Sequence, residues 1–267
     1  MLPFWPPFWL TAAFAAALGL IAGSYLNVLI HRLPLGISTV TPRSRCPACE
    51  TPIRALDNLP VLSFLLLRGC CRSCGARISW RYPLVEAATA LLFVGCVIAY
   101  GPTLQALMAA TFCCLMVALA MIDADHMILP DRITWPGIAL GFLFHAALVL
   151  HLNLPWRHML GPLFGCLLGG GLPLAIYGVW WLIRREEGLG LGDAKMMALI
   201  GTFLEWKALL VAFFFAVLAG AVVGLVLMGR SGEGLRTRLP FGVFLALGGL
   251  IALFAGPAII GFYLRLL

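Results

Sequence analysis

Long apolar stretches dominate the chain, and their spacing predicts about eight membrane-spanning helices. A helix needs about 20 mainly apolar residues to cross the roughly 30 Å hydrocarbon layer. The stretches cover approximately residues 8–30, 84–100, 103–122, 133–152, 159–183, 194–205, 207–229 and 240–264. The sixth is too short to cross at about 1.5 Å per residue. We therefore expect it either to begin below the membrane surface or to continue into the seventh.

The composition supports this interpretation. The chain of 267 residues is 62% hydrophobic and 11% charged, whereas soluble domains are about 45–50% apolar and about 25% charged. One water-soluble core cannot hold so many apolar residues, so we expect an all-α polytopic membrane protein in contact with lipid. A net charge of +7 would suggest nucleic acid for a soluble protein. In a membrane protein it indicates cytoplasmic loops, and we expect no nucleic-acid partner.

The basic residues predict the orientation of the chain. The N-terminus, MLPFWPPFWL, lacks the basic region of a secretory signal, so we expect a retained first span with its N-terminus outside. Only Arg157, Lys207 and Arg265 then fall on the outer side, and cytoplasmic loops are the ones that favour basic residues. The inner side would carry the other 15 of the 18 lysines and arginines: Arg32, Arg43, Arg45, Arg54, Arg68, Arg72, Arg77, Arg81, Arg132, Arg184, Arg185, Lys195, Arg230, Arg236 and Arg238.

One stretch, residues 31–83, is too polar for the membrane and predicts a small cytoplasmic insert after the first span. It reads CPACETPI from Cys46 and CRSCGARI from Cys71, so the motif C-x-x-C-x-x-x-I occurs twice. Two such knuckles supply four thiolates, the usual closed structural zinc site. We therefore predict a structural zinc ion on Cys46, Cys49, Cys71 and Cys74.

Two other uses of these cysteines compete with zinc. Disulfides are disfavoured by the reducing cytoplasm, and a redox dithiol needs one pair rather than two. Cys70 lies beside Cys71 and is able to replace it as a ligand, so the ligand set stays open here. The remaining cysteines fall in spans, where they suit small packing positions: Cys96, Cys113, Cys114 and Cys166.

Two aspartates stand out because ionisable groups in a membrane are costly and mark function by default. Asp123 ends the third span, and Asp193 opens the short sixth one in the string GLGLGD. The topology places both at the cytoplasmic face. Asp125 is a rival to Asp123, but two residues along a helix it points to another face. Glu86, near the start of the second span, is explained by the helix dipole.

A close pair of carboxylates suits peptide hydrolysis. Both cannot ionise cheaply, so the pair shares a proton. The ionised member activates water and the protonated one polarises the carbonyl. A helix cap or a proton pathway would use the same residues, and the residues alone do not decide between these roles. Motifs of other hydrolases, H-E-x-x-H and G-x-S-x-G, are absent from the sequence.

Taken together, the motifs resemble the type IV prepilin peptidase family, whose members often also carry N-methyltransferase activity. The similarity covers nearly the whole chain. It rests on the segments GSYLNVLIHRLP at 23–34, CPAC and CRSC, NLPVLSFLLLRG at 58–69, ISWRYPLVEAATALLF at 78–93, IDADHMILPD at 122–131 and GLGLGDAK at 188–195. The adjacent Cys70 is the main departure from the family pattern.

The resemblance implies that Asp123 and Asp193 form the peptidase pair. It implies cleavage of the basic leader of prepilins and pseudopilins on the cytoplasmic side of the inner membrane. It further implies methylation of the new N-terminal residue from S-adenosylmethionine, by a half comprising residues 1–100, with the peptidase in residues 101–267. No residue locates the methyl donor, although Gly69 and Glu86 lie in family-like segments.

Two alternative functions remain at this stage. One is a peptidase alone, with the zinc module purely structural. The other is a transporter or assembly scaffold in which the aspartates carry protons. Proton carriage needs a path across the membrane, and no acidic residue falls in the middle of a predicted span.

Overall fold

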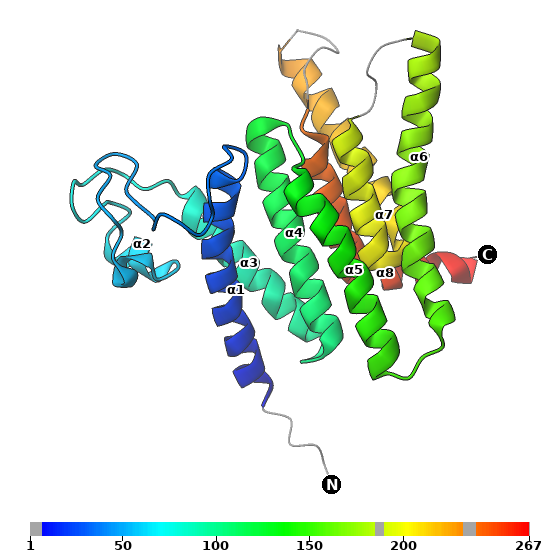
Figure 1. Ribbon diagram of the computed structural model, residues 1–267, viewed down its shortest axis with the longest axis horizontal. Coiled ribbons are helices and arrows are strands. Elements are labelled where there is room, and N and C mark those ends of the chain that lie inside the picture. The colour runs from blue at the N-terminus through cyan, green and yellow to red at the C-terminus, as the bar shows by residue number, and fades with distance from the viewer. Residues whose placement is uncertain (1–6, 185–189, 232–238, 267) are drawn as a thin grey trace. The chain divides into compact units, whose positions relative to one another are not determined.

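The computed structural model describes residues 7–184, 190–231 and 239–266, and it is helical throughout the predicted spans (Figure 1). Over these residues it contains no strand, only two isolated β-bridges. The all-α fold class is confirmed. Three of the predicted inner-loop arginines, Arg185, Arg236 and Arg238, lie outside the described residues. The elements are α1 Phe8–Arg32, η1 Ala55–Asn58, α2 Leu62–Leu66, α3 Arg81–Tyr100, α4 Leu104–His126, α5 Asp131–His151, η2 Trp156–Met159, α6 Leu160–Arg184, α7 Leu191–Ser231 and α8 Phe241–Leu266.

Seven of the described helices are long and apolar enough to cross a membrane. The chain is thus a multi-pass membrane protein. The number differs from the expected eight because the sixth and seventh stretches form two helices that meet at a kink and are counted together as α7, Leu191–Ser231. Its regular geometry is broken only at Glu205, where φ is 63° and ψ is 172°. The sixth and seventh stretches are therefore separate helices joined without a loop, as the predicted boundary between residues 205 and 207 has it.

Helix α7 reverses direction at Glu205, so its two arms have different neighbours. The first arm follows α6: Gly201 lies against Gly165, and residue 198 lies against Gly170. The second arm follows α8, with residue 212 beside Gly248. The ribbon of Figure 1 shows the reversal. The first arm, residues 191–204, is only about 21 Å long at 1.5 Å per residue.

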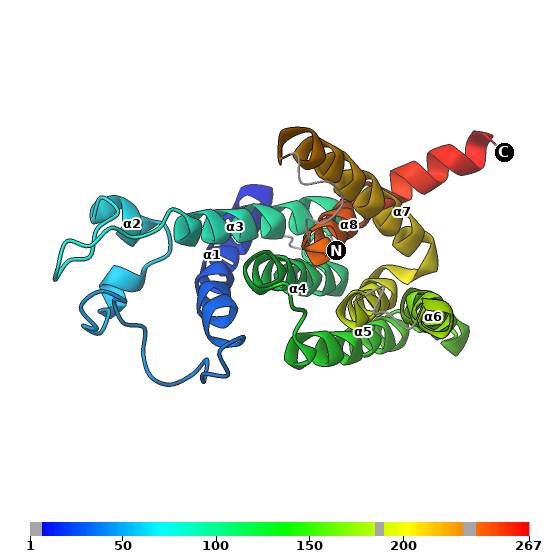
Figure 2. The ribbon, with the colours of Figure 1, turned by 90° about the horizontal axis from the view of Figure 1, so that it is seen from above.

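The contacts within the chain divide it into two compact units, residues up to Ala118 and residues from Leu119. In the first unit α1 packs on α3 (Figure 2). Gly19 and Gly23 lie one turn apart on α1 and allow the two backbones to meet. A Cβ atom at Gly19 would be 2.6 Å from Cα of Ala90, and one at Gly23 would be 2.7 Å from Cα of Glu86. Lipid gives helices little hydrophobic reason to associate, so such close approach is the main source of attraction.

In the second unit the same kind of contact joins α6 to the first arm of α7. A Cβ atom at Gly165 would collide with the carbonyl of Gly201, and a Cβ atom at Gly201 would collide with the carbonyl of Gly165. Gly169 meets the carbonyl of Met197 in the same way. The side chains of Leu199 and Ile200, on the other faces of this arm, are completely buried. The arm that carries Asp193 is therefore held by backbone packing on one side and core packing on the others.

We predict that Gly165→Leu lowers the stability of the folded protein by about 2 kcal/mol, because overpacking a tight contact costs about 1–3 kcal/mol. Gly171→Leu is the matched control on the same helix, since nothing lies within 4 Å of a Cβ atom there. It should change stability by less than about 0.5 kcal/mol. Thermal unfolding of both variants in detergent gives the comparison. Equal melting temperatures for the two would contradict the packing assignment.

Candidate active site and metal centre

The two cysteine knuckles have the same local geometry. In each, the residue after the second cysteine donates its backbone N–H to the carbonyl of the first. The nitrogen of Glu50 lies 2.8 Å from the carbonyl oxygen of Cys46, and the nitrogen of Gly75 lies 2.9 Å from that of Cys71. Both donor residues have left-handed backbone angles, with φ of 55° and 71°. The internal repeat seen in the sequence is thus also a structural repeat.

The knuckles bring four sulfur atoms together: Sγ of Cys46, Cys49, Cys71 and Cys74 all lie within 4.8 Å of one another. A tetrahedral zinc ion with bonds of about 2.3 Å would separate its sulfur ligands by about 3.8 Å. The Sγ atoms of Cys46 and Cys74 are 3.9 Å apart. The cluster therefore has the ligand number, the ligand type and the size of a structural zinc site.

Two of these thiols, one in each knuckle, are predisposed to the thiolate form that binds metal. Hydrogen bonding to the side chain and then to the backbone of Thr51 lowers the pKa of Cys49 to about 6. Backbone hydrogen bonds from Cys74 and then Ser73 lower the pKa of Cys71. Each knuckle therefore has one thiol that favours the thiolate form, whereas the pKa of Cys74 is raised to about 12.

Cys70 is placed outside the cluster. It forms an isolated bridge with Arg77, in the position that Arg45 takes in the first knuckle, where Arg45 bridges to Pro52. Its Sγ atom lies 3.7 Å from the carbonyl oxygen of Arg68. The repeat therefore assigns Cys70 to the residue before the knuckle and Cys71 to its first ligand position, which the sequence alone left open.

Asp123 occupies the last turn of α4 and is only 5% exposed. Backbone N–H groups of Gly242 and Val243, in the first turn of α8, face its carboxylate. A Cβ atom at Gly242 would lie 2.8 Å from Oδ2 of Asp123, so only glycine fits there. Among the described residues, this Oδ2 is the one buried side-chain nitrogen or oxygen atom that has no hydrogen-bond partner. A helix N-terminus and an unoccupied acceptor make the position suitable for a reacting carboxylate.

Asp193 lies in the first turn of α7 and is half-buried. Its charge interacts with that of Asp123, so the two predicted residues, on separate helices, lie within electrostatic reach of each other. Gly190 leaves room for the side chain, since a Cβ atom there would be 3.1 Å from Oδ2 of Asp193. Residues 188 and 189, which begin the GLGLGD string, lie outside the described part. Asp125 is exposed, on a different face of α4 from Asp123.

The segments that follow the two aspartates are joined directly. Lys195 donates a hydrogen bond from Nζ to Oδ1 of Asp131, which links α7 to the first residue of α5. Leu129 lies in the connection from α4 to α5, and its side chain packs against Gly192 and Gly242. A Cβ atom added at Gly192 would lie 3.1 Å from this side chain, and one added at Gly242 would lie 3.0 Å from it. The connection thus packs against the starts of both α7 and α8. The sequence did not predict either contact.

Glu86 is a second acidic residue whose surroundings the sequence did not predict. It is 8% exposed, and its Oε2 atom accepts the backbone N–H of Val61 at 2.7 Å. Ser24 on α1 also hydrogen-bonds to it. Val61 has φ of 58°, which is strained for a β-branched residue. Glu86 therefore fixes the polar insert to α3. The helix-dipole explanation was wrong, because α3 begins at Arg81 and has no acidic residue in its first turn.

Two family models match this chain. A model of the bacterial peptidase A24 N-terminal domain matches residues 17–100, and a model of the type IV leader peptidase family matches residues 110–225. Relatives named prepilin leader peptidase/N-methyltransferase are similar over most of the chain. One from Myxococcus xanthus (strain DK1622) is 43% identical over 230 residues, 86% of this chain and 67% of the relative.

Two further relatives with the same name cover more of both chains. That of Burkholderia pseudomallei (strain 1026b) is 37% identical over 279 residues, 95% of this chain and 87% of its own. The relative from Aeromonas hydrophila is 37% identical over 281 residues, which are 96% of this chain and 94% of the relative. No solved structure matches the chain at a significant level.

We predict about one zinc ion per chain in purified protein, because the cluster offers one tetrahedral set of sulfur ligands. The double variant Cys46→Ser, Cys49→Ser should lose this zinc. Cys70→Ser is the matched control and should keep it. Metal analysis by mass spectrometry measures all three proteins. Full zinc content in the double variant, or its loss from Cys70→Ser, would show that the ligands are misassigned.

Proposed function

The chain belongs to the type IV leader peptidase family, and on that premise we propose that it cleaves the basic leader peptide from type IV prepilins and pseudopilins with Asp123 and Asp193. The observation that carries the proposal is that Asp123 on α4 and Asp193 on α7 lie near enough for their charges to interact. One of them is buried and keeps an acceptor oxygen without a partner. A purely structural pair of helix caps would have no need of this arrangement.

In the proposed reaction the two carboxylates divide the work. The ionised one accepts a proton from water as the water oxygen attacks the scissile carbonyl carbon. The protonated one donates its proton to the carbonyl oxygen. When the C–N bond breaks, a proton returns to the departing amine and the leader keeps the new carboxylate. The first-turn N–H groups of α8 hold Asp123 in place for both steps.

We further propose that the reaction takes place at the cytoplasmic face of the inner membrane. The arginine-rich loops favour this face, and both aspartates lie at helix ends that border those loops. A basic leader emerging from the membrane would reach the pair there. A proton transporter is disfavoured, because the acidic residues sit at helix ends rather than along a path through the spans.

The second proposed activity is methylation of the new N-terminus, by the half of the chain comprising residues 1–100. S-adenosylmethionine, when bound, supplies the methyl group. A bond forms from the α-amine nitrogen to the methyl carbon as the bond from sulfur to that carbon breaks. The nitrogen then loses a proton to water, and neutral S-adenosylhomocysteine remains. Structural zinc on the four cysteines would keep the insert folded, since so small a module has little core.

We predict that Asp123→Ala and Asp193→Ala each lower the rate of prepilin cleavage by about 10³-fold or more. When catalytic groups act as a unit, the loss of either one removes most of the activity of both. Asp125→Ala, an exposed change on the same helix, should retain much more activity. Cleavage of a purified prepilin by each variant, at equal membrane content, measures the effect. A near wild-type rate in either of the first two variants would remove the dyad from the mechanism.

We also predict that a strain carrying Cys46→Ser and Cys49→Ser produces pilin that is cleaved but poorly methylated. Loss of the metal should unfold the insert, whereas the helices around Asp123 and Asp193 are stabilised by their own packing. Mass spectrometry of the mature pilin N-terminus distinguishes the outcomes. A fully methylated N-terminus would make the insert dispensable for methyl transfer. Uncleaved prepilin would show that the two halves act as one cooperative unit.

A further inference from the structure

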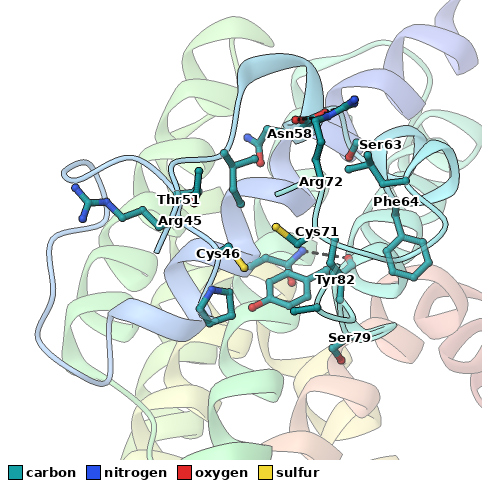
Figure 3. A pocket seen from close by; sticks show the side chains of 18 of the residues that line it. Arg45, Cys46, Thr51, Asn58, Ser63, Phe64, Cys71, Arg72, Ser79 and Tyr82 are labelled. Atoms are coloured by element: carbon teal, nitrogen blue, oxygen red, sulfur yellow. Dashed lines mark hydrogen bonds and ion pairs between the residues drawn. The ribbon is translucent and has the colours of Figure 1, made fainter. Parts of the chain in front are cut away.

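A cavity of about 630 Å³ lies between the insert, the end of α1 and the start of α3. Figure 3 shows side chains from distant parts of the insert around it, including Cys46, Cys71 and Tyr82. Pockets that enclose small molecules usually measure about 300–1,000 Å³. The cavity is therefore large enough for a cofactor the size of a nucleoside bearing an amino acid. It lies entirely within the first unit.

Glu86 supplies the most unusual group on the wall of this cavity. Its side chain is more than nine-tenths buried, and its two described partners, the N–H of Val61 and the hydroxyl of Ser24, are both neutral. Among the described residues no cation forms an ion pair with it. Buried carboxylates normally face a positive charge. A cationic ligand in the cavity would provide one.

The rest of the lining fits a ligand that is also flat and partly anionic. Tyr82 offers an exposed aromatic ring, and Ile53, Leu67 and Ile78 offer apolar surface. Five arginines border the cavity: Arg32, Arg45, Arg54, Arg72 and Arg77.

Two of these guanidinium groups are already engaged. Arg72 pairs with Asp57 at 2.7 Å, and Arg32 donates to the carbonyls of Ser38 and Pro42. The other three form no hydrogen bond through their side chains within the described part of the chain. They remain suitable for the carboxylate of a ligand.

We propose that this cavity is the binding site for S-adenosylmethionine, with Glu86 facing the sulfonium charge. The proposal rests on the methyl transfer proposed above and locates its donor. The ligand combines a flat base, a buried positive charge and a free carboxylate, and the cavity supplies a partner for each. The headgroup of an anionic phospholipid would use the arginines but leave Glu86 facing no cation.

The test exploits the charge difference between the donor and its product, because S-adenosylhomocysteine has the same shape without the sulfonium charge. Binding of each compound to full-length protein in phosphatidylcholine nanodiscs is measured by calorimetry. In Glu86→Gln the affinity for S-adenosylmethionine should fall about tenfold or more, since a charge interaction near 4 Å is lost. The affinity for S-adenosylhomocysteine should change less than about threefold. A misfolded variant would lose both, and its zinc content reports the fold independently.

Glu50→Gln is the matched control, an exposed carboxylate of the same insert that does not line the cavity. It should bind both compounds like the native protein. An equal loss of both compounds from zinc-replete Glu86→Gln, or no loss of either, would overturn the assignment of Glu86. Displacement of the donor by phosphatidylglycerol added to the nanodiscs would identify a headgroup site instead. If native protein binds neither compound yet cleaves prepilin, the methyl-transfer proposal itself fails while the peptidase stands.

Discussion

Close approach of helix backbones in lipid is the constraint on which the rest of this structure depends. Apolar surface gains little by being buried against other helices when lipid is equally apolar, so helices associate where small residues allow tight contact. In this chain several of those contacts also position acidic residues. Gly242 of α8 lies against the carboxylate of Asp123, Gly190 lies against that of Asp193, and Gly23 of α1 lies against the backbone of Glu86. The packing that holds the helices together therefore also makes room for the carboxylates at their ends.

Each unit holds a polar site at the end of its membrane-spanning helices, and the contacts that hold the site differ between the two units. In the second unit an ion pair between Lys195 and Asp131 and the side chain of Leu129 join the segments that carry the aspartates. In the first unit Glu86 binds the backbone of a strained Val61, and the cysteine cluster closes the far side of the insert. The cavity is consequently bounded by helix on one side and by the cysteine-containing loops of the insert on the other.

Much of this was predictable from residues alone, because apolar runs, charged loops and repeated C-x-x-C pairs are local signals. The spans, the insert and the residues of both clusters followed from them. The abrupt kink within α7 did not, since it depends on one residue, Glu205, with an unusual backbone angle. The exclusion of Cys70 needed the hydrogen bonds of the knuckle. Glu86 was misjudged because the helix dipole explained it adequately, whereas its burial and its bond to Val61 depend on contacts across 25 positions of sequence.

We propose that Asp123 and Asp193 act as one catalytic unit, and a kinetic double-mutant cycle measures whether they do. Asp123→Asn and Asp193→Asn preserve the size of each side chain, and a single-turnover assay with excess enzyme and a labelled prepilin measures the residual rates. We predict that the double variant cleaves no more slowly than the slower single variant, because either change already disables the pair. Losses that multiply in the double variant would show two independent contributions and contradict it.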